Sequence, residues 1–268
     1  MKVIKMDTEN MTEQQFIEWY QAHEKGKYET PSMTTDMIIL ANKEEKLQLL
    51  LIQRKQHPFK NSWAFPGGFV DMDEDLDTGA ARELREETGL ENVYATQLYT
   101  WSDVERDPRM RVISTSYLAL VERDALLTAK AADDAADVAL FTITLPLVKK
   151  QLGTQQVTLH LSHAEKGQLS AELAITYTQV GKQWHEELTI LDKQGIAFDH
   201  AKAIVYAVLR LRERIHYSPI ALELLPQQFS FEQLKQAYEA IAYEQLAKPT
   251  VLQFVEKVAM DTYQAKQV

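Results

Sequence analysis

The chain has 268 residues, of which 45% are hydrophobic and 25% are charged, and its formal net charge is −10. A chain of this length accommodates one large hydrophobic core or two smaller ones, and the absence of cysteine excludes disulfides and thiolate metal sites. The acidic balance disfavours nonspecific attraction to nucleic acid or to anionic membranes.

The first half of the chain mixes helical and strand patterns. Apolar residues at helical spacing predict an amphipathic helix over residues 10–26. A second helix is expected over residues 76–88, with Asp75 or Asp77 as its N-cap and Gly89 after its last turn. Alternating or continuous apolar segments of strand length predict four strands: 35–41, 46–55, 93–103 and 111–121.

The second half begins with strands and ends with helices. Residues 129–143 are expected to start as a loop and end as a strand. Alternation of polar and apolar residues in 157–163 and 169–191 predicts an added antiparallel hairpin or three-stranded piece near residues 155–192. Three helices are expected after it, over residues 200–215, 231–243 and 249–260.

Charge is divided unevenly along the chain. Residues 196–268 contain eight basic and eight acidic residues, whereas the first 195 residues contain 21 basic and 31 acidic ones. We therefore expect two domains, residues 1–195 and 196–268. The N-terminal segment lacks the apolar core of a signal peptide, and no run of about 18 apolar residues occurs. These features predict a cytoplasmic protein that does not enter a membrane.

Three glutamates on the helix expected over residues 76–88 indicate a metal site. Glu83, Glu86 and Glu87 lie at positions i, i+3 and i+4, so their side chains project from one side of the helix. Like charges at these spacings repel one another, whereas three converging carboxylates suit Mg²⁺ or Mn²⁺, whose charge would offset the repulsion. The alternative interpretation is a solvated, glutamate-rich helix face.

The residues around this helix follow a longer pattern. After Gly68 come five residues and Glu74, then seven residues and Arg82-Glu83-Leu84. Glu86-Glu87 and Gly89-Leu90 follow, each after one intervening residue. This 23-residue segment resembles the signature of the Nudix hydrolase family at all nine defined positions.

The resemblance implies an α/β fold, with an α/β/α sandwich around a mixed sheet, and hydrolysis of a nucleoside diphosphate linked to another moiety. It implies that Glu83, Glu86 and Glu87 hold the metal, while Arg82 and Glu74 support the helix. The Gly67-Gly68 turn leaves room for a backbone carbonyl, and for phosphates of a ligand, to approach the same ion. A further acidic ligand or base is expected outside the segment, and the candidates are Asp103, Glu105 and Glu122.

Two neighbouring segments, NSWAFPGGFVD and DVERDPRMRVIS, resemble Nudix proteins that act on or bind ADP-ribose. We expect the substrate-binding residues in and near them: Arg54, Trp63, Gly67, Gly68, Phe69, Arg106, Arg109 and Arg111. Guanidinium groups bind phosphate oxygens bidentately, and Trp63 would contact the base. The alternatives are local pairing of the arginines with nearby carboxylates and burial of Trp63 in the core.

Residues 198–241 resemble the C-terminal domain of Nudix-related transcriptional regulators of NAD biosynthesis, which bind DNA through a winged helix-turn-helix. The resemblance implies a C-terminal, mainly helical, winged-helix-like domain. Two features argue against DNA binding. The expected recognition helix over 248–260 offers only two lysines, and the residues after Met260 are too few for a wing hairpin. The cluster Arg210, Arg212 and Arg214 is interpreted as a solvated helix face.

These features predict a Mg²⁺-dependent Nudix hydrolase that cleaves the pyrophosphate of ADP-ribose or a related nucleoside diphosphate derivative. The alternative is an ADP-ribose-sensing transcriptional regulator of NAD metabolism, with DNA as a partner. A third interpretation, a pyrophosphatase for oxidised nucleoside triphosphates, fits the Nudix segment but not the C-terminal domain. The resemblance also implies a homodimer.

Overall fold

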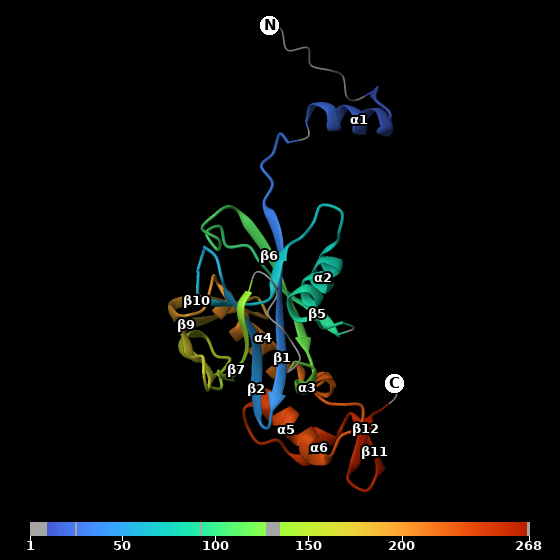
Figure 1. The fold of residues 1–268 in the computed structure, drawn as a ribbon, viewed down its shortest axis with the longest axis vertical. Coiled ribbons are helices and arrows are strands. Elements are labelled where there is room, and N and C mark those ends of the chain that lie inside the picture. Colours follow the sequence, from blue (N-terminus) through green and yellow to red (C-terminus); the bar gives the residue numbers. More distant parts are fainter. Residues whose placement is uncertain (1–9, 25, 92, 127–134, 267–268) are drawn as a thin grey trace.

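The computed structural model describes residues 10–24, 26–91, 93–126 and 135–266. Most of its strands form one mixed sheet in the order β10-β9-β8-β7-β2-β1-β6-β5, with β3 paired to β2 and β4 paired to β1 (Figure 1). β1 and β6 are parallel, and the other neighbours are antiparallel. The strands of this sheet are β1 (Ser32–Lys43), β2 (Lys46–Arg54), β3 (Trp63–Ala64), β4 (Gly67–Phe69), β5 (Ala95–Trp101), β6 (Val112–Leu120), β7 (Ala135–Thr144), β8 (Gly153–His163), β9 (Gly167–Val180) and β10 (Gln183–Gln194).

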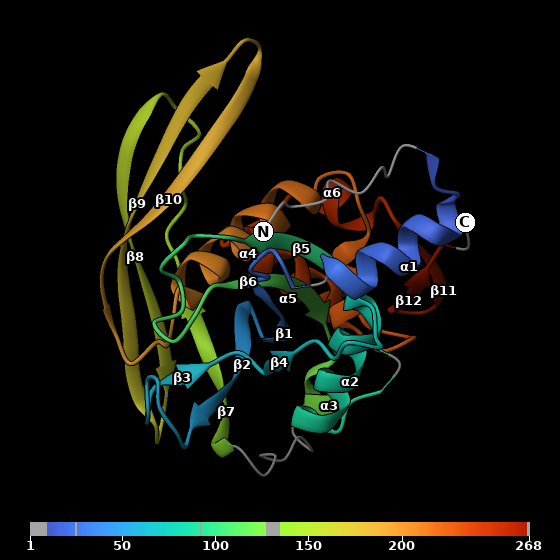
Figure 2. The same cartoon turned by 90° about the horizontal axis from the view of Figure 1, so that it is seen from above.

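Helices lie on both faces of the sheet (Figure 2). The helices of the described residues, of which α1 lies apart from the sheet, are α1 (Glu13–His23), α2 (Leu76–Thr88), α3 (Arg123–Leu126), α4 (His200–Arg214), α5 (Phe231–Ala242) and α6 (Lys248–Leu252), with a 3₁₀ turn, η2 (Ile220–Leu224). Strand β1 shows why two layers form, because its buried residues alternate between the faces. Ile38 and Leu40 belong to the core that includes α4 and α5, whereas Met37 and Ile39 pack with α2. The α/β/α sandwich around a mixed sheet is therefore confirmed.

The core on the α4 side crosses the domain boundary expected between residues 195 and 196. Leu49 and Leu51 of β2 share one buried cluster with Ile204 of α4 and Leu234 of α5. The C-terminal helices thus supply the second layer of the sandwich, and no break in the core marks the expected boundary.

Strands β8, β9 and β10 extend the sheet beyond its central part. In Figure 2 they form a long ribbon beside the two helical layers. Of the two alternatives for this region, the structure has the three-stranded antiparallel piece. Alternate side chains of β9, such as Leu173 and Ile175, are buried, which matches the polar and apolar alternation of the sequence.

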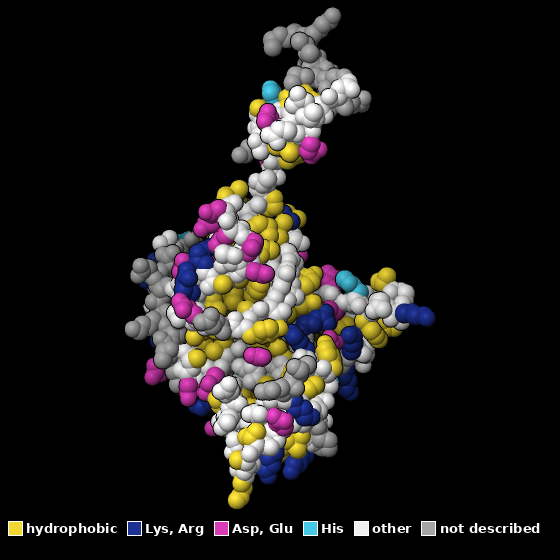
Figure 3. Space-filling model, turned by 90° about the vertical axis from the view of Figure 1, so that its right-hand side faces the viewer, with side chains coloured by type: hydrophobic (Ala, Val, Ile, Leu, Met, Phe, Trp, Pro, Cys, Tyr) yellow, Lys and Arg dark blue, Asp and Glu magenta, His cyan; other side chains and the backbone are white. Residues whose placement is uncertain are grey.

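Helix α1 lies apart from the remainder of the protein (Figure 1). A capping box of Thr12 and Gln15 begins it, and it has no buried residue. The space-filling view shows it projecting beyond the folded body (Figure 3). The helix is shorter than the predicted 10–26.

The C-terminal end of the chain differs from the prediction. The helix expected over 249–260 is wrong, because α6 ends at Leu252 and a two-stranded hairpin follows, β11 (Val255–Ala259) and β12 (Thr262–Ala265). The chain reverses at Asp261, whose φ is 55°. Phe229, before α5, forms an antiparallel bridge with Tyr263 of β12. The residues after Met260, which were expected to be too few for a hairpin, thus form one by pairing with β11, which precedes Met260.

The arginines of α4 are not a freely solvated face. Arg212 donates to the carbonyl oxygens of Leu145, Pro146 and Ile241, and so joins α4 to the segment after β7 and to α5. Arg210 pairs with Glu186 of β10 and with Glu213. No helix in the described part of the chain is long and apolar enough to cross a membrane.

Candidate active site

Helix α2 presents the glutamates and has the predicted bounds, residues 76–88. The Asp75 carboxylate accepts a hydrogen bond from the Thr78 backbone N–H at 2.8 Å, so Asp75 is the N-cap. Gly89 ends the helix with a left-handed φ of 73°, a conformation that glycine adopts without steric penalty. Ala80 and Leu84 are buried against the sheet. This packing fixes which face of α2 points outward.

Arg82 is the centre of a carboxylate network. Its guanidinium donates to Glu74 through Nη2 at 2.6 Å and through Nε at 3.0 Å. Its Nη1 lies 2.8 Å from Glu83 Oε1 and 3.1 Å from Glu86 Oε2. Nη2 also donates to the Phe69 carbonyl at 3.0 Å. Arg82 therefore joins α2 to the loop that follows β4, and three carboxylates share this one cation.

Two of these carboxylates have opposite pKa shifts. Hydrogen bonds from Arg82 and from the Asp71 backbone lower the pKa of Glu74 to about 2. Burial raises the pKa of Glu83, and this effect outweighs the opposing hydrogen bond and charge of Arg82. Glu74 is thus a firmly ionised partner of Arg82. For Glu83, the hydrogen bond and charge of Arg82 only partly offset the free-energy cost of burying its carboxylate.

Gly68 lies directly beside Glu83. A Cβ atom at residue 68 would lie 2.3 Å from Glu83 Oε1, so only glycine lets this carboxylate approach β4. Gly67 is constrained differently, because its Cβ would lie 2.2 Å from the Thr35 backbone oxygen at a φ of 151°. Gly67 therefore allows close contact with the backbone of β1, and Gly68 allows close contact with Glu83.

The donor set suits a hard divalent cation. Glu83 and Glu86 offer carboxylate oxygens, those of Glu83 beside Gly68, and the single positive charge of Arg82 does not balance the three carboxylates it contacts. Within the described ranges, no three His, Asp or Glu side chains are already gathered around one point as metal ligands. Arg82 engages only one oxygen of each carboxylate, Glu83 Oε1 and Glu86 Oε2.

A small cavity of about 180 Å³ adjoins the glycine pair. Typical small-molecule pockets measure about 300–1,000 Å³, so this cavity would hold one part of a ligand. Its lining residues come from β1, β2, β3, β4, the loop before β6 and the start of α4: Thr34, Asp36, Arg54, Ala64, Phe65, Gly67, Gly68, Phe69, Arg106, Asp107, Arg109, Val112, Phe198 and His200.

The predicted binding arginines have different environments. Arg106 lines the cavity but is buried and engaged by Asp199 through two hydrogen bonds, at 2.8 and 3.0 Å, so its guanidinium is already paired. Arg109 pairs with Asp107 at 2.8 Å but keeps 39% of its side chain exposed beside the cavity. Arg111 donates to the Ser102 and Asp103 carbonyls and does not line the cavity.

Arg54 and Arg109 are the two cations best placed to meet an anion. Burial and the positive charge of Arg109 both lower the pKa of Arg54, which indicates that the two guanidinium groups repel each other. Arg54 also donates to the Pro58 carbonyl at 2.8 Å. A phosphate group at this cavity would relieve the repulsion.

The two aromatic residues that were predicted to bind substrate, Trp63 and Phe69, also have different environments. Trp63 is 4% exposed and packs edge-on against Phe141 at 4.8 Å between ring centroids, so it belongs to the core and not to the cavity. Phe69 lines the cavity, is 43% exposed, and lies beneath the Arg109 guanidinium. Of these two aromatic residues, only Phe69 is placed to touch a ligand.

The candidates for an additional acid or base do not reach the cavity. Asp103 pairs with Lys202 at 2.6 Å, and Glu105 and Glu122 are exposed. Sequence reasoning missed Asp36, Phe198 and His200, which do line it. An aspartate within the apolar segment TDMIILA was the available signal for Asp36, because buried charges in strands are rare.

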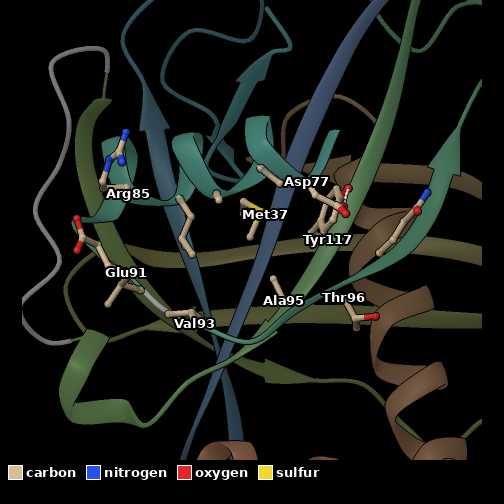
Figure 4. A pocket seen from close by; sticks show the side chains of 13 residues that line it. Met37, Asp77, Arg85, Glu91, Val93, Ala95, Thr96 and Tyr117 are labelled. Carbon is tan, nitrogen blue, oxygen red and sulfur yellow. Dashed lines mark hydrogen bonds between the residues drawn. The ribbon is translucent and has the colours of Figure 1, made fainter. Parts of the chain in front are cut away.

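A larger cavity, of about 760 Å³, lies between α2 and β5 (Figure 4). Met37, Asp77, Val93, Ala95 and Tyr117 line it, and the Tyr117 hydroxyl hydrogen-bonds to Asp77. None of the four residues Arg82, Glu83, Glu86 and Glu87 lines it. Size alone therefore does not identify the site. The smaller cavity is lined by Gly68, which lies beside the Glu83 carboxylate.

Comparison with known proteins supports the fold, and the family match spans the glutamate segment. The NUDIX domain family matches residues 31–159. The chain is 30% identical over 239 residues to the ADPR responsive transcriptional repressor NtrR of Acinetobacter baylyi, covering 88% of this chain and 76% of that protein. It is 39% identical over 116 residues to an ADP-ribose pyrophosphatase of Methanocaldococcus jannaschii, covering 43% of this chain and 64% of the relative.

Solved structures resemble the chain over nearly its full length. A MutT/nudix family protein from Enterococcus faecalis has a TM-score of 0.71 at 30% identity, covering 96% of this chain and 94% of that one. Shewanella oneidensis NrtR has a TM-score of 0.60 at 21% identity, covering 88% and 94%. The second likeness is one of fold. Both extend through the C-terminal third, so that part is shared with the neighbours and is not an addition to this chain.

Proposed function

The chain belongs to the Nudix family, and on that premise we propose that it is a pyrophosphohydrolase acting on ADP-ribose or a related nucleoside diphosphate derivative. The observation that carries the proposal is the contact between Gly68 and Glu83 on an intact α2, because it brings a buried carboxylate to the strand that borders the arginine-lined cavity. The reaction would add water across the pyrophosphate of ADP-ribose and release AMP and ribose 5-phosphate.

Glu83, Glu86 and Glu87 would hold Mg²⁺ or Mn²⁺, with the backbone of Gly68 beside the ion. When bound, the ion would neutralise pyrophosphate oxygens and lower the pKa of an attacking water. Arg82 and Glu74 would keep α2 aligned with the loop after β4, since their two hydrogen bonds join these segments. Arg54 and Arg109 would bind the phosphates, and Phe69 would pack against the nucleotide.

Two relatives support the choice of ADP-ribose. One is named as an ADP-ribose pyrophosphatase and the other as a repressor that responds to ADPR. The test is turnover with Mg²⁺ across ADP-ribose, NAD, ADP-glucose, dinucleoside polyphosphates and nucleoside triphosphates. We expect selective turnover of ADP-ribose. Turnover of none of these compounds would contradict the proposal.

A second candidate function is an ADP-ribose-responsive transcriptional regulator. The β11–β12 hairpin favours it, because a hairpin at this place would serve as the wing of a winged helix-turn-helix. The relative from Acinetobacter baylyi, which matches 88% of this chain, is named as such a repressor. The equal numbers of basic and acidic residues in 196–268 weigh against strong DNA binding.

These two functions differ in a measurable way. A regulator would select specific sites from a random-sequence duplex library, and its affinity would fall steeply with salt. An enzyme whose C-terminal third serves only the fold would select none. Cytoplasmic location and a homodimer remain part of the proposal, and sedimentation of the full chain would test the dimer.

A further inference from the structure

Helix α4 contributes a histidine to the cavity beside Gly68. His200, the first residue of α4, lines this cavity and is 4% exposed. Its ring stacks on Phe65 with centroids 4.4 Å apart. Buried polar atoms are normally hydrogen-bonded, so each of the two ring nitrogens of His200 should have a partner.

The first nitrogen is fixed by the backbone. The Phe65 N–H donates to His200 Nδ1 at 3.1 Å. A backbone N–H is always a donor, so Nδ1 must be unprotonated and the proton of the neutral ring must lie on Nε2. Burial lowers the pKa of His200 to about 3, which keeps the ring neutral at physiological pH.

The second nitrogen faces a carboxylate across a gap. His200 Nε2 lies 3.8 Å from Asp36 Oδ1, which is too long for a hydrogen bond. Among the described residues, none accepts a hydrogen bond from Nε2. Asp36 is itself held in place by Ser114 and lies 3.6 Å from Arg106. The cavity therefore has a donor and an acceptor side by side.

This pair suits a hydroxyl group better than a phosphate. One hydroxyl oxygen can lie about 2.8 Å from both atoms, accepting from Nε2–H and donating to the carboxylate. A phosphate oxygen would accept from Nε2–H equally well, but Asp36 would repel its charge. The arginines that suit phosphate, Arg54 and Arg109, line the same cavity, so a phosphate and its attached sugar could bind together.

The chain before α4 holds His200 in place. Phe198 has a φ of 47°, a conformation that is rare for a bulky residue and persists only where surrounding contacts impose it. Its ring packs against that of Phe59, with the ring centroids 4.8 Å apart, and lies beneath the Arg54 guanidinium. Lys193 donates a hydrogen bond to the Phe198 carbonyl. The donor is thus set rigidly at the junction between β10 and α4.

We propose that Asp36 and His200 form a hydroxyl-recognition subsite that binds a sugar hydroxyl of the nucleoside diphosphate ligand. This assignment rests on the proposed function and makes the C-terminal third part of the binding site. A bound ligand would bridge β1 and the first residue of α4, so occupancy of the cavity would be transmitted directly to that helix.

Two variants separate the roles of the two nitrogens. His200→Asn keeps an acceptor for the Phe65 N–H but removes the Nε2 donor, whereas His200→Gln carries an amide donor toward the position of Nε2. We expect His200→Asn to weaken ADP-ribose binding about 10-fold, measured by calorimetry in EDTA to prevent turnover, and His200→Gln to recover part of it. His185→Asn, on exposed β10, is the control and should bind as the wild type does.

Inorganic pyrophosphate, which has no hydroxyl group on a sugar, is the second probe. The Kd of pyrophosphate, obtained from its competition with ADP-ribose, should be the same for His200→Asn as for the wild type. If His200→Asn binds both ligands more weakly by the same factor, the hydroxyl assignment is overturned. It is also overturned if His200→Asn binds ADP-ribose as tightly as a wild-type chain that hydrolyses ADP-ribose. A wild-type chain that neither binds nor hydrolyses ADP-ribose would overturn the proposed function as well.

The wild-type chain allows a test that does not depend on folding of a variant. With ¹⁵N-labelled histidine, the Nε2–H resonance of His200 should shift when ADP-ribose is added and stay in place with pyrophosphate. A resonance that ADP-ribose leaves unchanged at saturation would contradict the proposal.

Discussion

Arg106 and Asp199 form a two-point ion pair between the loop before β6 and the start of α4. The Arg106 Nη2–Asp199 Oδ1 distance is 2.8 Å and the Nε–Oδ2 distance is 3.0 Å, and both side chains are buried. The pair joins residues 93 positions apart in the chain. It fixes α4 beside Asp36, and therefore fixes the position of His200 as well.

Breaking this pair should destabilise the whole protein. Asp199→Asn would leave the Arg106 charge buried without its two-point partner, with Asp36 at 3.6 Å and the nearby Asp107 as the remaining carboxylates. We expect a loss of about 3–5 kcal/mol in the free energy of unfolding, measured with urea. Lys202→Ala breaks a pair with Asp103, whose side chain is 63% exposed, and should cost less than about 1 kcal/mol. Similar small losses in both variants would contradict the structural role of Arg106.

The two glycines beside the glutamates should respond differently to alanine. Gly68→Ala places a methyl group against the mobile end of Glu83, so the fold should persist while turnover falls. Gly67→Ala places it against the Thr35 backbone, which cannot move without disturbing β1, so the melting temperature should drop as well. Melting curves and turnover of both variants provide the check. Equal melting temperatures for the two would be inconsistent with these contacts.

The Glu74–Arg82 contact should make stability depend on pH in the acidic range. The pKa of Glu74 is lowered from its ordinary 4.5 to about 2, so its stabilisation is complete above pH 4.5 and is lost as the pH falls toward 2. Glu74→Gln should therefore melt below the wild type at pH 7, and the difference should shrink between pH 4.5 and 2. Glu45→Gln, in the exposed β1–β2 turn, serves as the matched control. A difference independent of pH would argue against this ion pair.

A DNA-binding role would depend on the few lysines near the β11–β12 hairpin. Lys248 begins α6 and Lys257 lies on β11. If the chain is a regulator, replacing either lysine by alanine should weaken binding to a selected duplex and reduce the slope of log affinity against log salt by about 1. Fluorescence anisotropy across a KCl series measures this slope. Unchanged slopes in both variants would remove the β11–β12 hairpin and α6 from any DNA interface.

Local patterns predicted the parts of the site that lie close together in the sequence. Asp75, the glutamates and Gly89 share one helix with its own caps, so spacing alone was enough to place them. The β11–β12 hairpin could not be foreseen in this way, because residues 249–260 have a helical pattern and the bridge between Phe229 and Tyr263 is a nonlocal contact. For the same reason the sequence did not reveal that Arg106 pairs with Asp199, which lies 93 residues away along the chain.

Turnover by Glu87→Gln tests the central claim most directly. Glu87 lies on α2 with the predicted metal ligands, and the substitution removes one negative charge at nearly constant shape. The wild-type chain should hydrolyse ADP-ribose with Mg²⁺. Loss of an outer-shell partner of a metal lowers activity about 10–100-fold, so loss of a direct ligand should lower the turnover of the variant by at least this factor. Its melting temperature in EDTA should be unchanged. Undiminished turnover by Glu87→Gln would contradict the account of the three-glutamate metal site.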